Sequence, residues 1–225
     1  MGGKVFVGTR RGRGLLAVGA AALLLAGCGG GGGDAGAAAL GKKQATSVLP
    51  DAKAVPGWRM YMEPDAQEPV PEYPPSTCVA RTKEQRKTAC DPVTFWGASA
   101  FSRKSDKTTL DFWILAYEDE KTADAAYDVL AQWYGGDRVG QNAEKVEIGD
   151  PGAEHVANRA AVGTLAGPGT ITQIRVGTTV LGISTGTTGK AAVPDKEIKA
   201  FAAMFAERAQ QAQNGEKPSA AVPGS

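Results

Sequence analysis

The sequence has little of the chemistry on which metal sites and many active sites depend. Its 225 residues contain one histidine, His155, and three cysteines, none of them in a C-x-x-C pair. A metal site built on cysteine and histidine needs several such ligands at close spacing. We therefore expect no metal ion, no cofactor and no thioredoxin-like redox pair.

The chain also lacks a strong excess of charge of either sign. Four of its 25 basic residues lie in the first 14 positions, and none of its 24 acidic residues precedes Asp34. From residue 28 onward, 21 basic and 24 acidic residues therefore remain, a net charge of −3. Nucleic-acid binding needs a basic face, so we expect no nucleic acid among the partners.

The apolar run near the N-terminus is too short for an ordinary membrane-spanning helix. Residues 15–27 would span roughly 20 Å as a helix, against about 30 Å of hydrocarbon. Basic residues precede the run and small residues end it, which is typical of a secretory signal peptide at residues 1–27. The glycines within it suit a buried core helix poorly. Thr9-Arg10-Arg11 resembles a weak twin-arginine signal, so the general and the twin-arginine export routes both stay open.

The predicted signal peptide ends at a cysteine. Leu25-Ala26-Gly27-Cys28 resembles the lipobox of bacterial lipoproteins. That resemblance implies cleavage before Cys28, transfer of a diacylglycerol to its thiol and acylation of the new amino terminus, for example with palmitate. Two or three acyl chains, at about 0.8 kcal/mol per buried CH₂, anchor a protein durably where one chain does not. We expect a lipid anchor at Cys28 on the extracytoplasmic side of the cell membrane; an ordinary signal peptide with an incidental cysteine is the alternative.

Composition divides the rest of the chain. Residues 28–50 are rich in glycine and alanine, which predicts a flexible tether. Residues 63–75 hold five prolines, which predicts a loop or an extended arm. Residues 213–225 are polar, with proline and glycine, and predict a disordered tail. One domain, residues 51–212, remains between the tether and the tail.

Within that domain, periodicity predicts strands, a helix, further strands and a second helix. Six segments have the pattern or composition of strands: residues 93–101, 109–117, 143–148, 160–165, 170–176 and 178–184. The second of these is apolar on both sides and should be central and covered, at least in part, on both faces. Residues 118–136 and 194–212 place apolar residues at helical spacing, and residues 153–158 fit one helical turn.

This order predicts an α+β fold, in which a mostly antiparallel sheet of about five to six strands has its two main helices packed on one face.

Cys78 and Cys90 are the two cysteines that remain once Cys28 is lipidated. An exported domain lies in an oxidising compartment, where such a pair forms a disulfide. Closing a loop of this size would contribute on the order of 3 kcal/mol in the chain-entropy model. We predict a structural Cys78–Cys90 disulfide that ties the proline-rich arm to the first predicted hairpin.

Two short motifs could in principle carry chemistry. Residues 182–186, GISTG, match the G-x-S-x-G pattern around a nucleophilic serine, here Ser184. That pattern needs a helix directly after the serine and a histidine downstream, whereas Ser184 ends a predicted strand and His155 lies upstream. Residues 186–190, GTTGK, lack the first glycine and the final serine or threonine of a phosphate-binding loop. We interpret both motifs as parts of strands and turns, and predict no catalytic residue.

Three acidic residues, Glu118, Asp119 and Glu120, begin the first predicted main helix. The helix dipole favours negative charge at this end. A calcium site is the alternative, although the spaced ligand pattern of an EF-hand is absent. We interpret His155 as structural and most aromatic side chains as core; aromatic side chains exposed on a sheet or cleft would instead indicate carbohydrate or peptide binding.

Several segments of the globular part together resemble a known class of domain. They are "LDFWILAYEDEKTADAAYDVLAQWY", "IGDPGAEHVA", "ITQIRVGTTVLGIS" and "AFAAMFAERAQ". Across residues 90–212 this pattern resembles the extracellular sensor domains of mycobacterial serine/threonine kinases and related actinobacterial lipoproteins. The resemblance implies an extracellular binding or sensing role and an antiparallel sheet flanked by helices. Those kinase domains typically have two disulfides, whereas this chain can form one, and no family binding residue can be carried over.

These observations predict an exported, membrane-anchored lipoprotein with a non-catalytic, sensor-like domain that binds a small ligand or an envelope protein. Two alternatives stay open: a cell-envelope hydrolase that uses Ser184 or an acidic pair, and a structural envelope protein whose sheet face docks another protein. A pocket that joins Ser184, His155 and an aspartate would favour the hydrolase. A large exposed apolar patch would favour the docking protein. The sequence assigns no ligand-binding residue.

Overall fold

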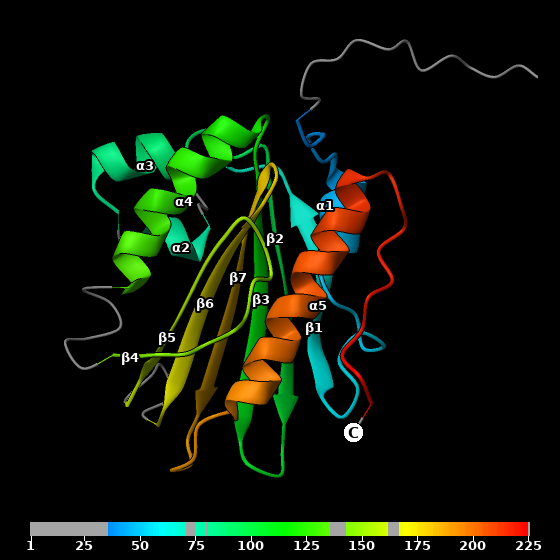
Figure 1. The fold of residues 1–225 in the computed structure, drawn as a ribbon, viewed down its shortest axis with the longest axis vertical. Coiled ribbons are helices and arrows are strands. Elements are labelled where there is room, and N and C mark those ends of the chain that lie inside the picture. Colours follow the sequence, from blue (N-terminus) through cyan, green and yellow to red (C-terminus); the bar gives the residue numbers. More distant parts are fainter. Residues whose placement is uncertain (1–35, 71–74, 80, 136–142, 162–166, 225) are drawn as a thin grey trace, which may run out of the picture. The chain divides into compact units, whose positions relative to one another are not determined.

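The computed structural model describes residues 36–70, 75–79, 81–135, 143–161 and 167–224 (Figure 1). Its strands are β1 Arg59–Gln67, β2 Phe95–Arg103, β3 Thr108–Ala116, β4 Glu144–Lys145, β5 Glu154–Ala160, β6 Gly169–Val176 and β7 Thr179–Thr187. Its helices are α1 Lys42–Val48, α2 Ser76–Val79, α3 Lys83–Ala89, α4 Glu120–Gly135 and α5 Asp195–Gln213.

Among the described residues, no helix is both long and apolar enough to cross a bilayer. The predicted signal peptide with Cys28, and most of the strand predicted at residues 160–165, lie outside the described residues.

The strands of the described part form one seven-stranded antiparallel sheet in the order β1-β2-β3-β7-β6-β5-β4. β3 pairs along its whole length with β2 on one side and β7 on the other. The predicted hairpin is β2 and β3, and the strands predicted at residues 170–176 and 178–184 are β6 and β7. The prediction of an α+β fold with an antiparallel sheet is confirmed.

Side chains alternate along β3 into two separate hydrophobic cores. Phe112 and Ile114 belong to the core that α1 and α5 cover, whereas Leu115 belongs to the core that α4 covers. We call these two sides of the sheet the α5 face and the α4 face; Figure 1 shows α5 crossing in front of the sheet. The prediction that both main helices pack on one face is therefore wrong. They cover opposite faces because β3 is apolar on both sides, and each side needs a cover.

The sheet is larger than the predicted five to six strands. β1 lies partly in the proline-rich stretch and contains Pro64. Proline is tolerated there because β1 is an edge strand that pairs with β2 alone. β5 covers residues predicted as a helical turn, and it pairs with β6 along all seven of its residues. Two alanines, Ala157 and Ala160, weaken the alternation of β5, so pairing with β6 decides its structure.

The folded unit extends beyond both of its predicted limits. α1 lies inside the predicted tether, and its Ala45 and Val48 are fully buried. The predicted tail, residues 213–225, is held in place as far as it is described: the Val222 N–H donates to the Ala54 carbonyl at 2.9 Å. A seven-residue helix is too short to show clear periodicity, and the tail is ordered by contacts that are distant in sequence.

A buried arginine joins α1, α5 and the C-terminal segment. Arg208 on α5 is 6% exposed, and burial lowers its pKa. Its guanidinium donates to the carbonyls of Ser47 and Val48 at 2.8 and 2.9 Å. It also donates to the carbonyls of Leu49 and Ala220 at 3.2 and 3.1 Å. Arg208 therefore satisfies the last carbonyls of α1, which have no partner within the helix, and holds the C-terminal segment beside them.

The variant Arg208→Met should destabilise the fold strongly. Methionine keeps an apolar stem but removes every donor, so the buried carbonyls lose their partners. We expect the free energy of unfolding to fall by about 3 kcal/mol or more. Chemical denaturation followed by circular dichroism measures this change. Arg86→Met, at an exposed arginine of α3, is the control and should change stability by no more than about 0.5 kcal/mol. Equal stability of the two variants would contradict the role of Arg208.

Candidate functional site

The predicted disulfide is present in the structure. Cys78 in α2 and Cys90 at the end of α3 are joined, with Sγ–Sγ 2.08 Å, and are 0% and 8% exposed. Both belong to the core of the α4 face, where α3 packs against α4. The disulfide therefore fastens the chain that precedes β2 to the sheet. Cys28 lies outside the described residues, so its lipidation stays a prediction.

The structure separates the two residues on which the predicted hydrolase alternative depends. Ser184 lies on β7 opposite Asp111, on the α4 face. His155 lies on β5 opposite Ile174, on the α5 face, and its Nε2 is 3.9 Å from a carboxylate oxygen of Asp150. Residues opposite one another in register share a face, so the sheet itself separates the serine from the imidazole. GISTG is part of β7 and forms no strand-to-helix elbow.

The other two sequence motifs have structural roles. In the segment 186–190, the Thr187 hydroxyl donates to the Asp106 carbonyl at 3.2 Å, which holds a turn. Asp119 caps α4, because its carboxylate accepts from the backbone N–H and the hydroxyl of Thr122 at 2.8 and 3.0 Å. These bonds hold the pKa of Asp119 below its ordinary value. Across the described ranges, no three His, Cys, Asp or Glu side chains lie close enough to bind one metal ion.

Polar and small side chains line the α4 face beyond the core under α4. Register places them in three rows across the sheet. The row nearest α4 is Val156, Gln173, Gly182, Trp113, Ala98 and Asp65. The middle row is Asn158, Ile171, Ser184, Asp111, Ala100 and Met62. The far row is Ala160, Gly169, Gly186, Thr109, Ser102 and Arg59. We call these three rows, with Tyr61 at their edge, the polar sheet face.

Asp111 is the centre of a hydrogen-bond network on the polar sheet face. The Tyr61 hydroxyl donates to Asp111 Oδ1 at 2.9 Å, and the Ser184 side chain bonds to the same carboxylate. Burial raises the pKa of Asp111, against these two hydrogen bonds, which lower it. Burial and the bond to Asp111 raise the pKa of Tyr61 to about 12. Tyr61 as a whole is 54% exposed, so this residue remains largely open to solvent while its hydroxyl is held by Asp111.

Trp113 lies directly over a glycine of the neighbouring strand. A Cβ at Gly182 would come within 1.8 Å of Trp113 Cε2, so only glycine leaves room for the indole. The glycine of the GISTG motif therefore serves the packing of Trp113. Trp113 is half-buried and brings a large apolar surface to the row nearest α4.

Two buried amides of the polar sheet face lack hydrogen-bond partners. Gln173 is 0% exposed, and neither its Oε1 nor its Nε2 has a partner. Asn158 is 8% exposed, and its Nδ2 has none. The two residues lie on neighbouring strands in adjacent rows. An unpaired buried polar group costs about 1–3 kcal/mol, and such groups are kept where a ligand or ordered water completes them.

The residues of this site could not be recognised from the sequence, for a physical reason. Its polar residues come from different strands, and each one alone is an ordinary residue of a partly exposed strand. One signal was available: Asp111 interrupts the apolar strand TLDFWILAY. A carboxylate in a central strand needs partners that only neighbouring strands supply, here Tyr61 and Ser184.

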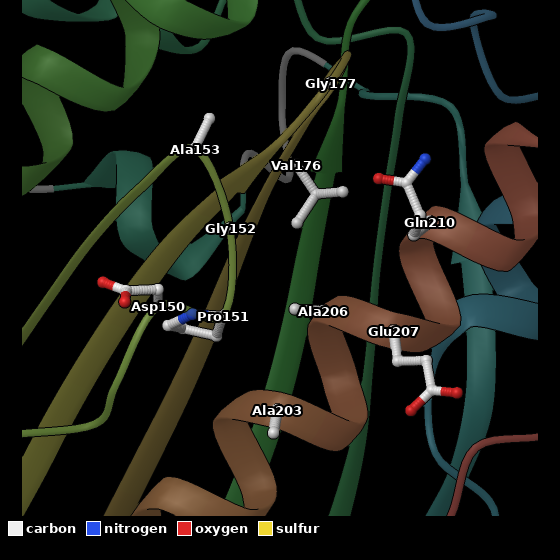
Figure 2. A pocket seen from close by; sticks show the side chains of 10 residues that line it. All are labelled: Asp150, Pro151, Gly152, Ala153, Val176, Gly177, Ala203, Ala206, Glu207 and Gln210. Carbon is white, nitrogen blue, oxygen red and sulfur yellow. The ribbon is translucent and has the colours of Figure 1, made fainter.

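A groove lies on the other side of the molecule, between α5 and the segment that leads into β5. Figure 2 shows its two walls, with the end of β6 between them. It has a volume of about 380 Å³ and is lined by Asp150, Pro151, Gly152, Ala153, Val176, Gly177, Ala203, Ala206, Glu207 and Gln210. We call it the α5 groove.

Comparison with protein-family models finds no match for the chain, and comparison with curated proteins finds none either. Among solved structures, the extracellular domain of PknH from Mycobacterium tuberculosis is similar. The TM-score is 0.49 and the identity 12%, over 80% of this chain and 100% of that chain. At this identity and TM-score, the likeness does not bear on what this chain binds or on the role of any residue.

The variant Asp111→Asn should stabilise the fold at neutral pH. Burial holds the pKa of Asp111 above its ordinary value, so the folded state disfavours the charged carboxylate, and asparagine keeps its shape without the charge. The gain should be full above the raised pKa. It should disappear as the pH falls to about 4 and below, where the native carboxyl is protonated in both states. Thermal unfolding across this pH range measures the difference.

Asp106→Asn is the matched control and should act in the opposite direction. Burial raises the pKa of Asp106, but hydrogen bonds from Arg103 and Thr108 outweigh it, and the pKa lies below its ordinary value. The charged form is therefore favoured in the folded state, and its loss should lower stability at neutral pH. A similar loss of stability in both variants would show that Asp111 carries no buried-charge cost.

Proposed function

We propose that this protein is an exported, lipid-anchored binding protein whose polar sheet face takes a carbohydrate-like ligand without catalysing a reaction. The observation that carries the proposal is the pair of buried, unpaired amides, Gln173 and Asn158, in the rows that also hold Trp113 and Asp111. Each unpaired group weakens the folded protein, and a ligand that pairs with it offsets this cost.

The chemistry of the polar sheet face matches a ligand with many hydroxyl groups. Gln173 carries both a donor and an acceptor and Asn158 carries a donor; these atoms are buried in the free protein, and a ligand reaches them only when the side chains that cover them move aside. Asp111 is an acceptor that already takes hydroxyl donors. Hydroxyl groups act as donor and acceptor at once, so they can satisfy all three. Aromatic surface lies beside these groups at Trp113 and Tyr61, and suits the apolar face of a sugar ring.

The positions of the other candidate residues favour this function over the two alternatives. Ser184 and His155 lie on opposite faces of the sheet, so the serine has no imidazole beside it to act as the base of a triad. A docking protein would present a large exposed apolar patch. Within the described ranges, the large apolar side chains that are more than two-fifths exposed are Tyr61, Met62, Val70 and Val79. The first two border the polar sheet face, where they suit a ligand.

A lipid at Cys28 would keep the start of the described domain close to the membrane. Eight residues separate Cys28 from Ala37, whose N–H donates to the Glu120 carboxylate at the start of α4. A fully extended chain spans at most about 3.6 Å per residue. A lipid at Cys28 would therefore keep this end of the domain within about 30 Å of the membrane surface.

The variant Cys28→Ala should release the protein from the membrane. The chain is expressed with its own N-terminus in a bacterium that processes lipoproteins, and a palmitate analogue is supplied. Native protein should carry the label and sediment with membranes, whereas Cys28→Ala should be unlabelled and soluble, because no thiol is left to accept the lipid. The control is Cys78→Ala/Cys90→Ala, which should stay labelled. Label and membrane retention in Cys28→Ala would refute the anchor.

The polar sheet face should bind a neutral oligosaccharide, for which N,N′,N″-triacetylchitotriose is the probe. Its hydroxyl and acetamido groups match the unpaired amides, and its rings have apolar faces. Titration followed by saturation-transfer NMR should show saturable binding to the full-length chain. Gln173→Leu should reduce the affinity at least tenfold while stability holds or rises, because the variant removes an unpaired buried amide.

Thr172→Val is the control for this experiment. Thr172 is the neighbour of Gln173 on β6, is 1% exposed and has an unpaired hydroxyl, but its side chain lies on the α5 face opposite Ile183. This variant should leave the affinity close to that of the native chain, while stability again holds or rises because an unpaired buried group is removed. No binding of the probe to native protein, or equal binding by Gln173→Leu, would contradict the proposed ligand site.

A further inference from the structure

Asp111 is a partly buried carboxylate that has no partner of opposite charge. It lies in the middle of β3, which pairs with β2 on one side and β7 on the other. The ion pairs found among the described residues do not include it. Its two side-chain partners, Tyr61 and Ser184, are neutral hydroxyls. Burial of a carboxylate without a countercharge disfavours its charged form, which raises the pKa of Asp111.

The rest of the polar sheet face does not supply the missing positive charge. Its three rows contain three charged residues, which are Asp111, Asp65 and Arg59. Asp65 and Arg59 are exposed and lie on β1, two strands away from Asp111. Solvent screens an exposed charge at such a distance, and Asp65 has the opposite sign to Arg59. The three rows therefore carry one more acidic residue than basic residues.

The carboxylate of Asp111 has acceptor capacity left for a ligand. An ionised carboxylate offers about four lone-pair sites on its two oxygens, and two hydroxyls leave part of these unused. Asp111 is half-buried, as are its row neighbours Ser184 and Ile171, whereas Gln173 is fully buried. A ligand can therefore reach this carboxylate without the side-chain movement that Gln173 requires.

Aromatic side chains lie beside the same carboxylate. The Tyr61 hydroxyl donates to Asp111 Oδ1 at 2.9 Å, which places the Tyr61 ring next to it. Trp113 is two residues further along β3 and therefore on the same face of the sheet. An aromatic ring attracts a cation within about 6 Å of its centroid. This part of the polar sheet face thus suits a sugar ring that carries a positive charge.

We infer that Asp111 determines which sugars the polar sheet face prefers, by pairing with a positively charged amino group, so that the ligand is an amino sugar with a free amine. This inference rests on the proposed carbohydrate site. An ammonium group brings the missing charge and three N–H donors, and hydrogen bonds between charged groups are the strongest that a carboxylate makes. The other hydroxyl groups of the sugar remain available for Gln173 and Asn158.

Two sugars that differ in charge test this inference. Chitotriose carries a free amino group on each ring, and N,N′,N″-triacetylchitotriose has the same backbone without charge. Calorimetric titration of the full-length chain is performed at about pH 6, where amino groups are protonated and an ordinary carboxyl group is ionised. Chitotriose should bind about tenfold more tightly than the triacetylated sugar. Added salt should narrow this difference.

The variant Asp111→Asn should abolish the preference, so that the two sugars bind within about twofold of one another. Asparagine keeps the shape of the side chain and one acceptor, and this variant should be more stable than the native chain, so unfolding would not explain the result. Asp91→Asn, at an exposed carboxylate outside the three rows, makes the same change in net charge and should keep the preference. An unchanged preference in Asp111→Asn would overturn the inference.

The outcomes separate this inference from the carbohydrate site on which it rests. Binding of the triacetylated sugar as tightly as chitotriose would overturn the inference and leave the site in place. Binding of neither sugar would overturn both. Gln173→Leu removes an uncharged amide, so it should weaken both sugars together and leave the ratio of their affinities unchanged. Circular dichroism confirms that each variant is folded.

Discussion

The structure depends on one constraint: β3 is apolar on both sides and must be covered on both. Phe112 and Ile114 require one helix layer, and Leu115 and Tyr117 require another. α5 meets the first need and α4 the second, so the sheet lies between two cores. Arg208 completes the first layer by binding α1 and the C-terminal segment, and the disulfide fastens the second.

The polar sheet face and the α5 groove both lie where the helices leave part of the sheet uncovered. Beyond the core under α4, the strands present polar and small side chains, so that Asp111, Ser184 and Gln173 share one face. On the opposite side, α5 meets the segment before β5 through alanine and glycine, which leaves a groove between them. On the polar sheet face the protein keeps buried polar atoms without partners. Such atoms lower stability, and a bound ligand or an ordered water molecule would complete them.

Much of the fold was predictable, because the spacing of apolar residues in a long segment indicates which of its side chains are buried. The β2–β3 hairpin, β6, β7 and both main helices carry their pattern in their own residues. Short or alanine-rich elements do not: α1 has seven residues, β5 is masked by alanine, and β1 is broken by Pro64. The face that each helix covers was not predictable either, because a helix's apolar stripe does not say which side of the sheet it meets.

The sequence by itself determined the elements whose signal is local: the apolar periodicity of the hairpin and the main helices, the pairing of the only two cysteines left for a disulfide, and the resemblance to a lipobox at Cys28. The tertiary structure alone decided which polar residues meet. Asp111 and Ser184 are 73 positions apart, as their numbers show, and become neighbours because β3 pairs with β7. Ser184 and His155 are closer in sequence but lie on opposite sides of the sheet. Strand order and register set these relations, and both depend on long-range pairing that no local pattern encodes.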